Sequence, residues 1–288
     1  MDAGTLALAA AISASDAQAT ANAVPEPAPF KLDVSADFWL PRLEGHFTDN
    51  GADVDVRTVD VHDSTPSFGG TLGFRSDRIA FSVRGFAFST TGATDASEAF
   101  TLGGITVNQG DAFHSSFSWW GFGGELLYDF YRPNAERPMM WSDAREGWKA
   151  PANNTDFSVF TTVSADIQSM ARDIVDTTTS DSTTANEAFL TLELGIGVRV
   201  GFDTRESFPL VRRMEICGKA QAGLAMPMGS GDSSMGTASH IEADATAWFS
   251  PQCAAYFGYR LIGLSADAEE LSLTGSLQGL RAGIKLEF

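Results

Sequence analysis

The sequence lacks any long hydrophobic run. It has 288 residues and a mean hydropathy of −0.06, and no stretch of it reaches the roughly 18 consecutive apolar residues of a transmembrane helix. Membrane-spanning helices are therefore excluded. A membrane β-barrel is not excluded by this absence, because its strands alternate apolar and polar residues.

Basic residues and cysteine are also scarce. The chain has 19 Lys and Arg against 37 Asp and Glu, which gives a formal net charge of −18. Nucleic-acid binding depends on Lys and Arg that neutralise phosphates, so we expect no nucleic-acid partner. The two cysteines, Cys217 and Cys253, say little about the redox compartment.

Glycine and phenylalanine are abundant, with 28 and 21 residues, and this composition favours many strands. The clearest strand pattern is the last stretch, LRAGIKLEF. Its apolar residues occupy every second position from Leu280 to Phe288, while Arg281, Lys285 and Glu287 lie on the opposite face. This is the period of two that a β-strand produces.

The same period recurs along the chain from residue 30. At Pro41 the apolar phase slips, which predicts a β-bulge. Most runs have the roughly 9–11 residues that a tilted strand needs to cross a bilayer, and are longer than the strands of a soluble sandwich. We predict an all-β, closed, antiparallel up-and-down transmembrane barrel of about ten strands, with eight or twelve as alternatives. The predicted strands are 32–40, 68–74, 79–87, 120–130, 157–167, 188–202, 214–226, 241–249, 255–261 and 280–288.

The polar face of these strands carries cations and anions in nearly equal numbers, although the whole chain is strongly acidic. We interpret this face as a lumen filled by an ion-paired network; the alternative is the solvated outer face of a soluble sheet, where ion pairs contribute little. The predicted network consists of Asp33, Asp37, Arg75, Arg84, Glu125, Asp129, Glu193, Arg199, Glu215, Lys219, Glu242, Asp244, Arg260, Arg281 and Lys285. Lys31, Asp166 and Glu287 lie on the same polar face.

The connections between predicted strands differ at the two ends of the barrel. Those at one end are mostly short, as in RSDR and SPQ, which predicts the periplasmic side. The exception is 132–155, whose Trp141 and Trp148 predict either a plug of the barrel mouth or an interfacial anchor. Those at the other end are long and acidic, and predict extracellular loops: 48–65, 91–112, 170–186, 228–239 and 263–271.

Residues 1–29 precede the predicted barrel domain, 30–288. They contain a short apolar run, a small-x-small pattern at Ala17 to Ala19, and a proline-rich end, but no basic residue. We interpret them as a signal-peptide remnant followed by a linker; the alternative is an Ala-rich disordered leader.

On these residues the chain resembles the bacterial outer-membrane β-barrel superfamily. The most specific match is the terminal strand, where Leu280, Ala282, Ile284, Leu286 and Phe288 resemble the signal that the barrel assembly machinery recognises. The resemblance implies a place in the bacterial outer membrane, with lipid and the assembly machinery as partners. It also implies interfacial aromatic girdles, for which the candidates are Trp39, Trp120, Tyr128, Phe130, Phe202 and Tyr259.

Three residue types are candidates for chemistry. The four histidines, His46, His62, His114 and His240, are expected near the extracellular rim, where His62 or His240 beside carboxylates is a candidate hydrolytic centre of the kind found in omptin proteases, although no omptin motif matches.

A Ca²⁺ site is a candidate only at Asp49, Asp53 and Asp55, which lack the EF-hand spacing; otherwise we expect loosely bound divalent cations and no cofactor. Cys217 is expected to face the lumen and Cys253 the lipid, and both are expected to be free thiols, with a bond near the periplasmic rim as the alternative.

The expected function is therefore that of a non-enzymatic outer-membrane barrel with an ion-paired lumen and acidic loops, in a structural or surface-interaction role. The alternatives are a narrow channel for small solutes or ions, and an outer-membrane hydrolase with its site at the rim. A soluble ligand-carrying barrel is a further alternative.

Overall fold

Ten long strands form the wall of this protein. The structure is a computed structural model, and it describes residues 30–49, 51–76, 78–133, 155–204, 207–208, 210–229, 234–268 and 271–288. Among these residues, no helix is long and apolar enough to cross a membrane. The strands are β1 (Lys31–Asp49), β2 (Ala52–Asp55), β3 (Ser67–Ser76), β4 (Ile79–Asp95), β5 (Phe100–Leu102), β6 (Ile105–Val107), β7 (Ala112–Tyr131), β8 (Thr155–Asp176), β9 (Ser182–Asp203), β10 (Arg213–Pro227), β11 (Ser234–Trp248), β12 (Cys253–Asp267) and β13 (Ser272–Glu287).

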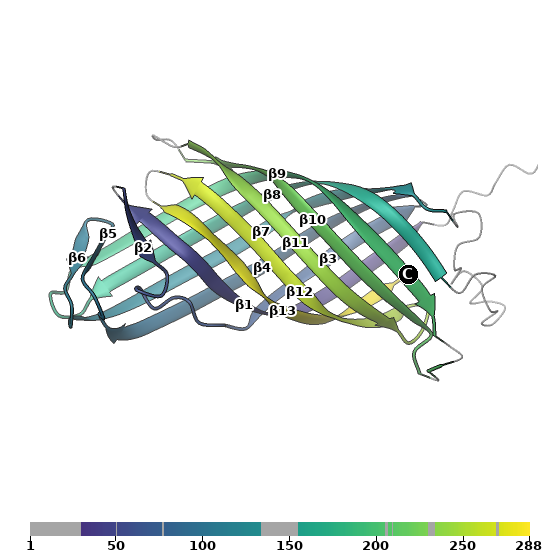
Figure 1. The fold of residues 1–288 in the computed structure, drawn as a ribbon, viewed down its shortest axis with the longest axis horizontal. Coiled ribbons are helices and arrows are strands. Elements are labelled where there is room, and N and C mark those ends of the chain that lie inside the picture. Colours follow the sequence, from purple (N-terminus) through teal and green to yellow (C-terminus); the bar gives the residue numbers. More distant parts are fainter. Residues whose placement is uncertain are drawn as a thin grey trace, which may run out of the picture.

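The wall closes between the first and last strands. Each wall strand pairs antiparallel with the next, and β13 also pairs with β1, from Asp33 opposite Glu287 to Thr48 opposite Ser272. The short strand β2 pairs only with β1, and β5 and β6 form a separate hairpin (Figure 1). The predicted closed ten-stranded barrel is thereby confirmed, and closure leaves no free edge along the membrane-facing part of the sheet.

The two ends of the barrel differ. Leu32 and Phe288 exchange backbone hydrogen bonds of 3.0 and 2.9 Å at one end, where the short connections also lie. The connections β1 to β3 and β4 to β7, with β2, β5 and β6, lie at the other end, on the left in Figure 1. In outer-membrane barrels short turns face the periplasm and long loops face outward. We therefore call the end at Phe288 the periplasmic end and the other the extracellular end.

The periplasmic half of the wall is apolar outside and charged inside. Trp120, Tyr128, Phe130, Phe202 and Tyr259 all point outward, as the girdle prediction requires. Such a belt is favourable next to lipid, because contact of this large apolar area with water would cost free energy. Other exposed members of the belt are Phe38, Phe68, Leu72, Phe81, Phe122, Leu126, Val163, Ile167, Leu194, Ile196, Ile216, Ile241, Phe257, Leu280 and Ile284.

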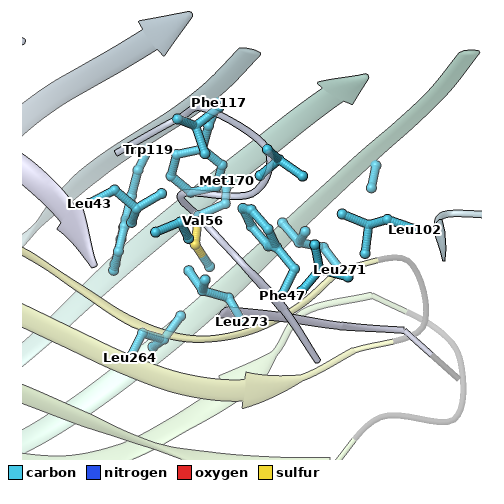
Figure 2. Close-up of a cluster of buried hydrophobic side chains, with 14 of the residues drawn as sticks. Leu43, Phe47, Val56, Leu102, Phe117, Trp119, Met170, Leu264, Leu271 and Leu273 are labelled. Atoms are coloured by element: carbon cyan, nitrogen blue, oxygen red, sulfur yellow. The ribbon is translucent and has the colours of Figure 1, made fainter. Parts of the chain in front are cut away.

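The extracellular half has the opposite polarity. Its outward positions are mostly polar, as in Ser116, Asp173 and Thr274, and its interior is mainly a buried hydrophobic core, which we call the apolar cluster (Figure 2). Apolar side chains inside and polar side chains outside are typical of a protein surrounded by water, which indicates that this half lies above the bilayer. The apolar cluster consists of Trp39, Leu43, Phe47, Val54, Val56, Val59, Val61, Phe88, Ala96, Phe100, Leu102, Val107, Phe113, Phe117, Trp119, Met170, Ile174, Ala185, Phe189, Ala225, Ala238, Ile262, Leu264, Ala266, Ala268, Leu271, Leu273 and Leu277.

This change of polarity corrects two predictions on β1. The prediction of a β-bulge at Pro41 is wrong, because the pairing with β13 continues without a shift. Leu40, Pro41 and Arg42 lie opposite Leu280, Gly279 and Gln278. The apolar residues move to the other face there because the strand leaves the membrane, and no residue is inserted. Trp39 is not a girdle residue, because its side chain points inward and is only 1% exposed.

The predicted extracellular loops are shorter than expected, because the strands continue into them. In 170–186, for example, β8 runs to Asp176 and β9 starts at Ser182, so the connection is a tight hairpin tip. The connection from β1 to β3 instead folds inward, and its Val54, Val56, Val59 and Val61 are buried in the apolar cluster. The predicted leader 1–29 and most of the 132–155 segment lie outside the described residues.

Candidate functional site: the charged lumen

Glu242 on β11 is the centre of the ion pairs in the lumen. Its Oε1 accepts hydrogen bonds from Arg260 Nε at 2.8 Å and from Arg281 Nη1 at 3.0 Å, and its Oε2 lies 3.1 Å from Lys219 Nζ. The three cations come from β12, β13 and β10. Strict alternation places every one of these side chains inside, since each lies on the face opposite the lipid-facing apolar residues.

The same pairs extend across the barrel. Arg260 Nη2 donates to Asp37 Oδ2 on β1 at 2.9 Å, and Lys219 Nζ donates to Glu125 Oε2 on β7 at 2.7 Å. Arg281 also forms a two-point contact with Asp244. These connections join strands that are not neighbours in the sheet, so they brace the lumen from within.

Arg84 on β4 extends this group to β8. Its guanidinium donates to Asp166 through Nη2 at 2.8 Å and Nε at 3.2 Å, and to Glu125 Oε2 at 3.1 Å. Two-point arginine to carboxylate contacts have a fixed geometry. We call the whole group the central network: Asp37, Arg84, Glu125, Asp166, Lys219, Glu242, Asp244, Arg260 and Arg281.

A second group of ion pairs, the lower network, lies nearer the periplasmic end. Asp129 Oδ2 lies 3.7 Å from Arg75 and 3.9 Å from Arg199, while Glu215 lies 3.6 Å from Arg199 and accepts a hydrogen bond from Arg213 at 2.8 Å. Arg132 Nη2 donates to Asp156 Oδ2 at 3.1 Å. At the mouth itself, Lys31 pairs with Glu287 and Lys285 with Asp33.

A layer of neutral polar groups separates the central network from the apolar cluster. Trp119 Nε1 donates to Gln168 Oε1 at 2.8 Å in this layer, whereas Gln221 Nε2 donates to Thr162 Oγ1 at 2.9 Å beside the central network. Gln168 Nε2 in turn lies 3.4 Å from Thr191 Oγ1. The lumen therefore changes along its axis from charged to neutral polar and then to mainly apolar, with Arg172 buried over the Phe47 ring in the apolar part.

Cavities lie among the lumen side chains of the described residues, and two of them concern the charged residues. The larger has a volume of about 220 Å³ and lies among charged residues of both networks, including Asp37, Arg75, Arg199, Glu215 and Lys219. The smaller, beside His240 and Gln168, has a volume of about 30 Å³, which is room for roughly one or two water molecules. The periplasmic half therefore contains open space among its charges, whereas the apolar cluster above it is buried.

The ion pairs are balanced in a way that limits their cost. A buried ion loses hydration worth several kcal/mol, and only good geometry and extra hydrogen bonds offset that loss. In the central network each cation contacts at least one carboxylate within 3.1 Å. Removal of a single charge therefore leaves its partners uncompensated, which is the costly case.

The structure brings nearly all the predicted network residues into ion pairs. Among the described residues, the exception is Glu193, which accepts a hydrogen bond from Ser164 Oγ at 3.4 Å. Sequence reasoning missed Arg132, Asp156 and Arg213 in the lower network. The alternation could have identified two of them. Asp156 is an even number of residues from Asp166 on β8, and Arg213 is two residues from Glu215 on β10, so each shares the inward face of its partner.

The histidines do not form one site. His46 Nε2 lies 3.8 Å from Asp53 Oδ1, and His62 Nε2 lies 4.0 Å from Asp63 Oδ1, both at the extracellular end. The expectation of a rim position is wrong for His240, which is 4% exposed and lies inside the lumen, 3.1 Å from Glu242 Oε1. Its even position on β11 puts it on the same inner face as Glu242.

The Ca²⁺ candidates are used by the protein itself. Asp49 Oδ2 accepts a hydrogen bond from Gly103 N at 2.7 Å, Asp53 Oδ1 accepts one from Thr48 Oγ1 at 2.8 Å, and Asp55 Oδ1 accepts one from Arg57 N at 2.8 Å. Within the described ranges, no three His, Cys, Asp or Glu side chains are arranged to hold a metal ion.

The cysteines lie on opposite faces of the wall, with β11 between their strands. Cys217 lines the larger cavity, whereas Cys253 falls on the outward face of β12, and both thiols are free, as predicted.

Neither a family model nor a curated protein sequence matches this chain. Solved structures share its architecture at low identity. The outer membrane protease OmpT from Escherichia coli is 9% identical with a TM-score of 0.41, covering 91% of this chain and 97% of that one. The transport unit of the autotransporter AIDA-I from Escherichia coli is 10% identical with a TM-score of 0.39, covering 92% and 90%. Neisserial surface protein A is 9% identical with a TM-score of 0.34, covering 90% and 97%. These similarities concern architecture and are too low to support an argument about function.

The geometry itself decides the class of protein. An even number of antiparallel wall strands, an apolar belt outside, an ion-paired lumen inside and short turns at one end are the features of single-chain outer-membrane barrels. The terminal strand that ends at Phe288 closes this wall. The described residues therefore form an integral membrane β-barrel of the outer-membrane type.

Proposed function

We propose that this protein is a non-conducting, non-enzymatic outer-membrane barrel with a structural or surface-interaction role. The apolar cluster carries the proposal. It fills the extracellular half of the barrel interior with large side chains such as Phe47, Phe117 and Trp119, none more than 1% exposed. Ions need water or polar ligands along their whole path, and a packed apolar constriction supplies neither.

The lumen contacts support a bracing role for the charges. Ion pairs between strands that are not direct neighbours, such as Arg260 with Asp37 and Lys219 with Glu125, fix the wall from within. A conduction path would instead require charged groups free to exchange partners with a passing ion. The polar outer surface above the apolar belt is the part that meets partners outside the cell.

The test is a planar-bilayer recording of the purified barrel. We expect no discrete conductance steps across a wide voltage range, with heat-modifiable migration in detergent gels showing that the sample is folded. Reproducible steps from folded protein would contradict the proposal and favour the second candidate, a narrow channel for small solutes or ions. The observation that favours this second candidate is the cavity of about 220 Å³ among the lumen charges.

The positions of the histidines support the absence of a hydrolytic site. His62 is on the β1 to β3 connection, while His240 is enclosed beside a cavity of about 30 Å³ that has no room for a peptide or lipid. We expect no turnover on a panel of peptides and lipids. Turnover that disappears in His62→Ala or His240→Ala would restore the hydrolase as a candidate.

The proposed partners follow from the surface. The exposed belt fits membrane lipid, and the terminal residues Leu280, Ala282, Ile284, Leu286 and Phe288 are the segment proposed to be recognised by the assembly machinery. The acidic extracellular residues repel polyanions, so nucleic acid is not a proposed partner, whereas divalent cations bound loosely there are.

A further inference from the structure

The extracellular half of the wall has a gap where one strand is too short. Below it, β3 lies between β1 and β4, but β3 begins at Ser67, opposite Trp39 of β1. Its pairing with β4 stops at Phe68 opposite Ala87, whereas β4 continues to Asp95. β4 therefore runs from Phe88 to Asp95, roughly 25 Å at about 3.3 Å per residue, with a wall strand on only one side.

The hydrogen-bond pattern identifies the backbone groups that face this gap. Asp129 N of β7 donates to Arg78 O at 2.8 Å, which places the even-numbered residues that follow in β4 in hydrogen-bonded pairs with β7. The odd-numbered residues Ser89, Thr91, Ala93 and Asp95 therefore direct their N–H and C=O groups into the gap. Ala93 N agrees with this direction, because it donates to Asp60 Oδ2 at 3.1 Å from the gap side.

The two sides of the gap are not equally covered. On the β1 side, Pro41 O accepts from Thr65 N at 3.2 Å and Gly45 O accepts from Val56 N at 3.1 Å, so the β1 to β3 connection is bonded to β1. On the β4 side, the contact from Asp60 to Ala93 is the only hydrogen bond seen within the described part of the chain. The connection thus lies in the gap without completing the sheet on β4.

Apart from the Asp60 carboxylate bonded to Ala93 N, no side chain in the described part of this edge resists pairing with another strand. Natural edge strands are protected by lysine, proline, inward charges or bulges. Here the exposed side chains are those of Ser89, Thr91, Ala93, Thr94 and Asp95, and the register with β7 is unbroken from Phe88 to Asp95. A straight edge with small side chains is the form that binds an added strand.

A second copy in the same membrane does not fit this edge. Two barrels related by a two-fold axis along the membrane normal would have strands tilted by about 35–45° in opposite senses, so their β4 edges would cross at roughly 70–90° and could not pair. The fitting occupant is an extended polypeptide segment outside the membrane. The exposed carboxylates of Asp63, Asp95 and Glu98 near the gap favour a basic one.

We propose that the β4 edge from Phe88 to Asp95 is a docking site for an extended basic polypeptide segment, which adds to the sheet in the gap above β3 and displaces the Asp60 carboxylate from Ala93 N. This deepens the proposed surface-interaction role and rests on it. Main-chain hydrogen bonds supply the affinity, and the acidic rim selects the charge of the partner.

The test uses two peptides of alternating lysine and valine, one plain and one N-methylated at every residue. Full N-methylation removes the donors from both edges of the added strand and leaves the charge unchanged. We expect folded protein in detergent to bind the plain peptide about tenfold or more tighter, a difference of about 1.4 kcal/mol, by fluorescence anisotropy. Equal binding of the two peptides would show charge attraction alone and overturn the proposal, as would no binding.

A matched pair of variants locates the site. Thr91→Pro removes an N–H that faces the gap and leaves the bonds to β7 intact, so it should weaken binding of the plain peptide about tenfold. Thr91→Val keeps this N–H and should bind as the wild type does. Wild-type affinity in folded Thr91→Pro overturns the location; if Thr91→Pro does not fold, the comparison of the two peptides on wild type still decides. A negative result leaves the conductance test of the proposed function unaffected.

Discussion

The guanidinium carbon of Arg260 lies 5.5 Å from the centre of the Trp39 ring, at the boundary between the charged and apolar halves of the barrel. Below this contact, Arg260 binds Asp37 and Glu242; above it, Trp39 belongs to the apolar cluster. A cation over the face of an indole ring is attracted by the ring quadrupole. One contact thus joins the membrane-spanning network to the core that seals the barrel.

Truncation within the apolar cluster should cost stability. Phe117→Ala removes a ring that is 0% exposed and leaves a cavity, so we expect the free energy of unfolding to fall by about 3–5 kcal/mol. The matched control is Phe122→Ala on the same strand, whose ring is 57% exposed toward lipid and should cost less. Urea titrations in lipid vesicles, followed by tryptophan fluorescence, measure both. Equal losses would mean that the extracellular interior is not packed.

Removal of the central carboxylate should be more damaging than removal of a surface one. Glu242→Gln leaves Lys219, Arg260 and Arg281 facing a neutral amide, and we expect a loss of about 3 kcal/mol or more. Glu44→Gln weakens contacts with Arg42 and Arg57 at the surface and should cost about 1 kcal/mol or less. The same urea titrations compare them, and a Glu242→Gln protein as stable as Glu44→Gln would argue against a bracing network.

Two adjacent glycines on β7 should respond differently to a methyl group. A Cβ at Gly123 would collide with the backbone of Ala165 and Asp166, whereas a Cβ at Gly124 first meets the Phe81 ring at 3.4 Å. We expect Gly123→Ala to lower the free energy of unfolding by about 1–3 kcal/mol through overpacking and Gly124→Ala to have little effect. Similar unfolding midpoints for the two would contradict the close approach of β7 and β8 at Asp166.

The packed apolar cluster predicts which thiols a reagent added outside the cell can reach. Cys217 lines the lumen cavity beneath the apolar cluster, and Cys253 is on the lipid face. A membrane-impermeant maleimide added to intact cells should label neither, but it should label Ser89→Cys on the exposed edge of β4. Mass spectrometry of the isolated barrel reads out the sites. Labelling of Cys217 from outside would reveal a water path through the apolar cluster.

Assembly should depend on the last residue. Phe288→Ala removes the terminal ring of the segment proposed as the assembly signal, and we expect less protein in the folded, heat-modifiable form in outer membranes. Phe249→Ala, which removes another exposed ring near the periplasmic end, is the control and should assemble normally. Equal yields of the folded form from the two variants would remove the role assigned to Phe288.

The sequence by itself determined the membrane-spanning half of the barrel. Alternation with a period of two specifies at once which residues face lipid and which face the lumen, so Arg281 could be placed opposite Ile284 without knowledge of the fold. The strand count and the closing pair followed from ten repeats of that pattern. Residues such as Arg213 and Asp156 were missed only because they lie at the ends of strands, where the pattern is shortest.

Only the tertiary structure decided the extracellular half. There the inner face becomes apolar, so the same alternation at Leu43 and Phe47 looked like a slip of phase at Pro41. The insertion of Val56 and Val61 into the interior and the early end of β3 at Ser67 depend on contacts between residues far apart in the chain. Alternation records which residues share a face, but whether that face meets lipid, water or a buried core depends on how far each strand rises above the membrane.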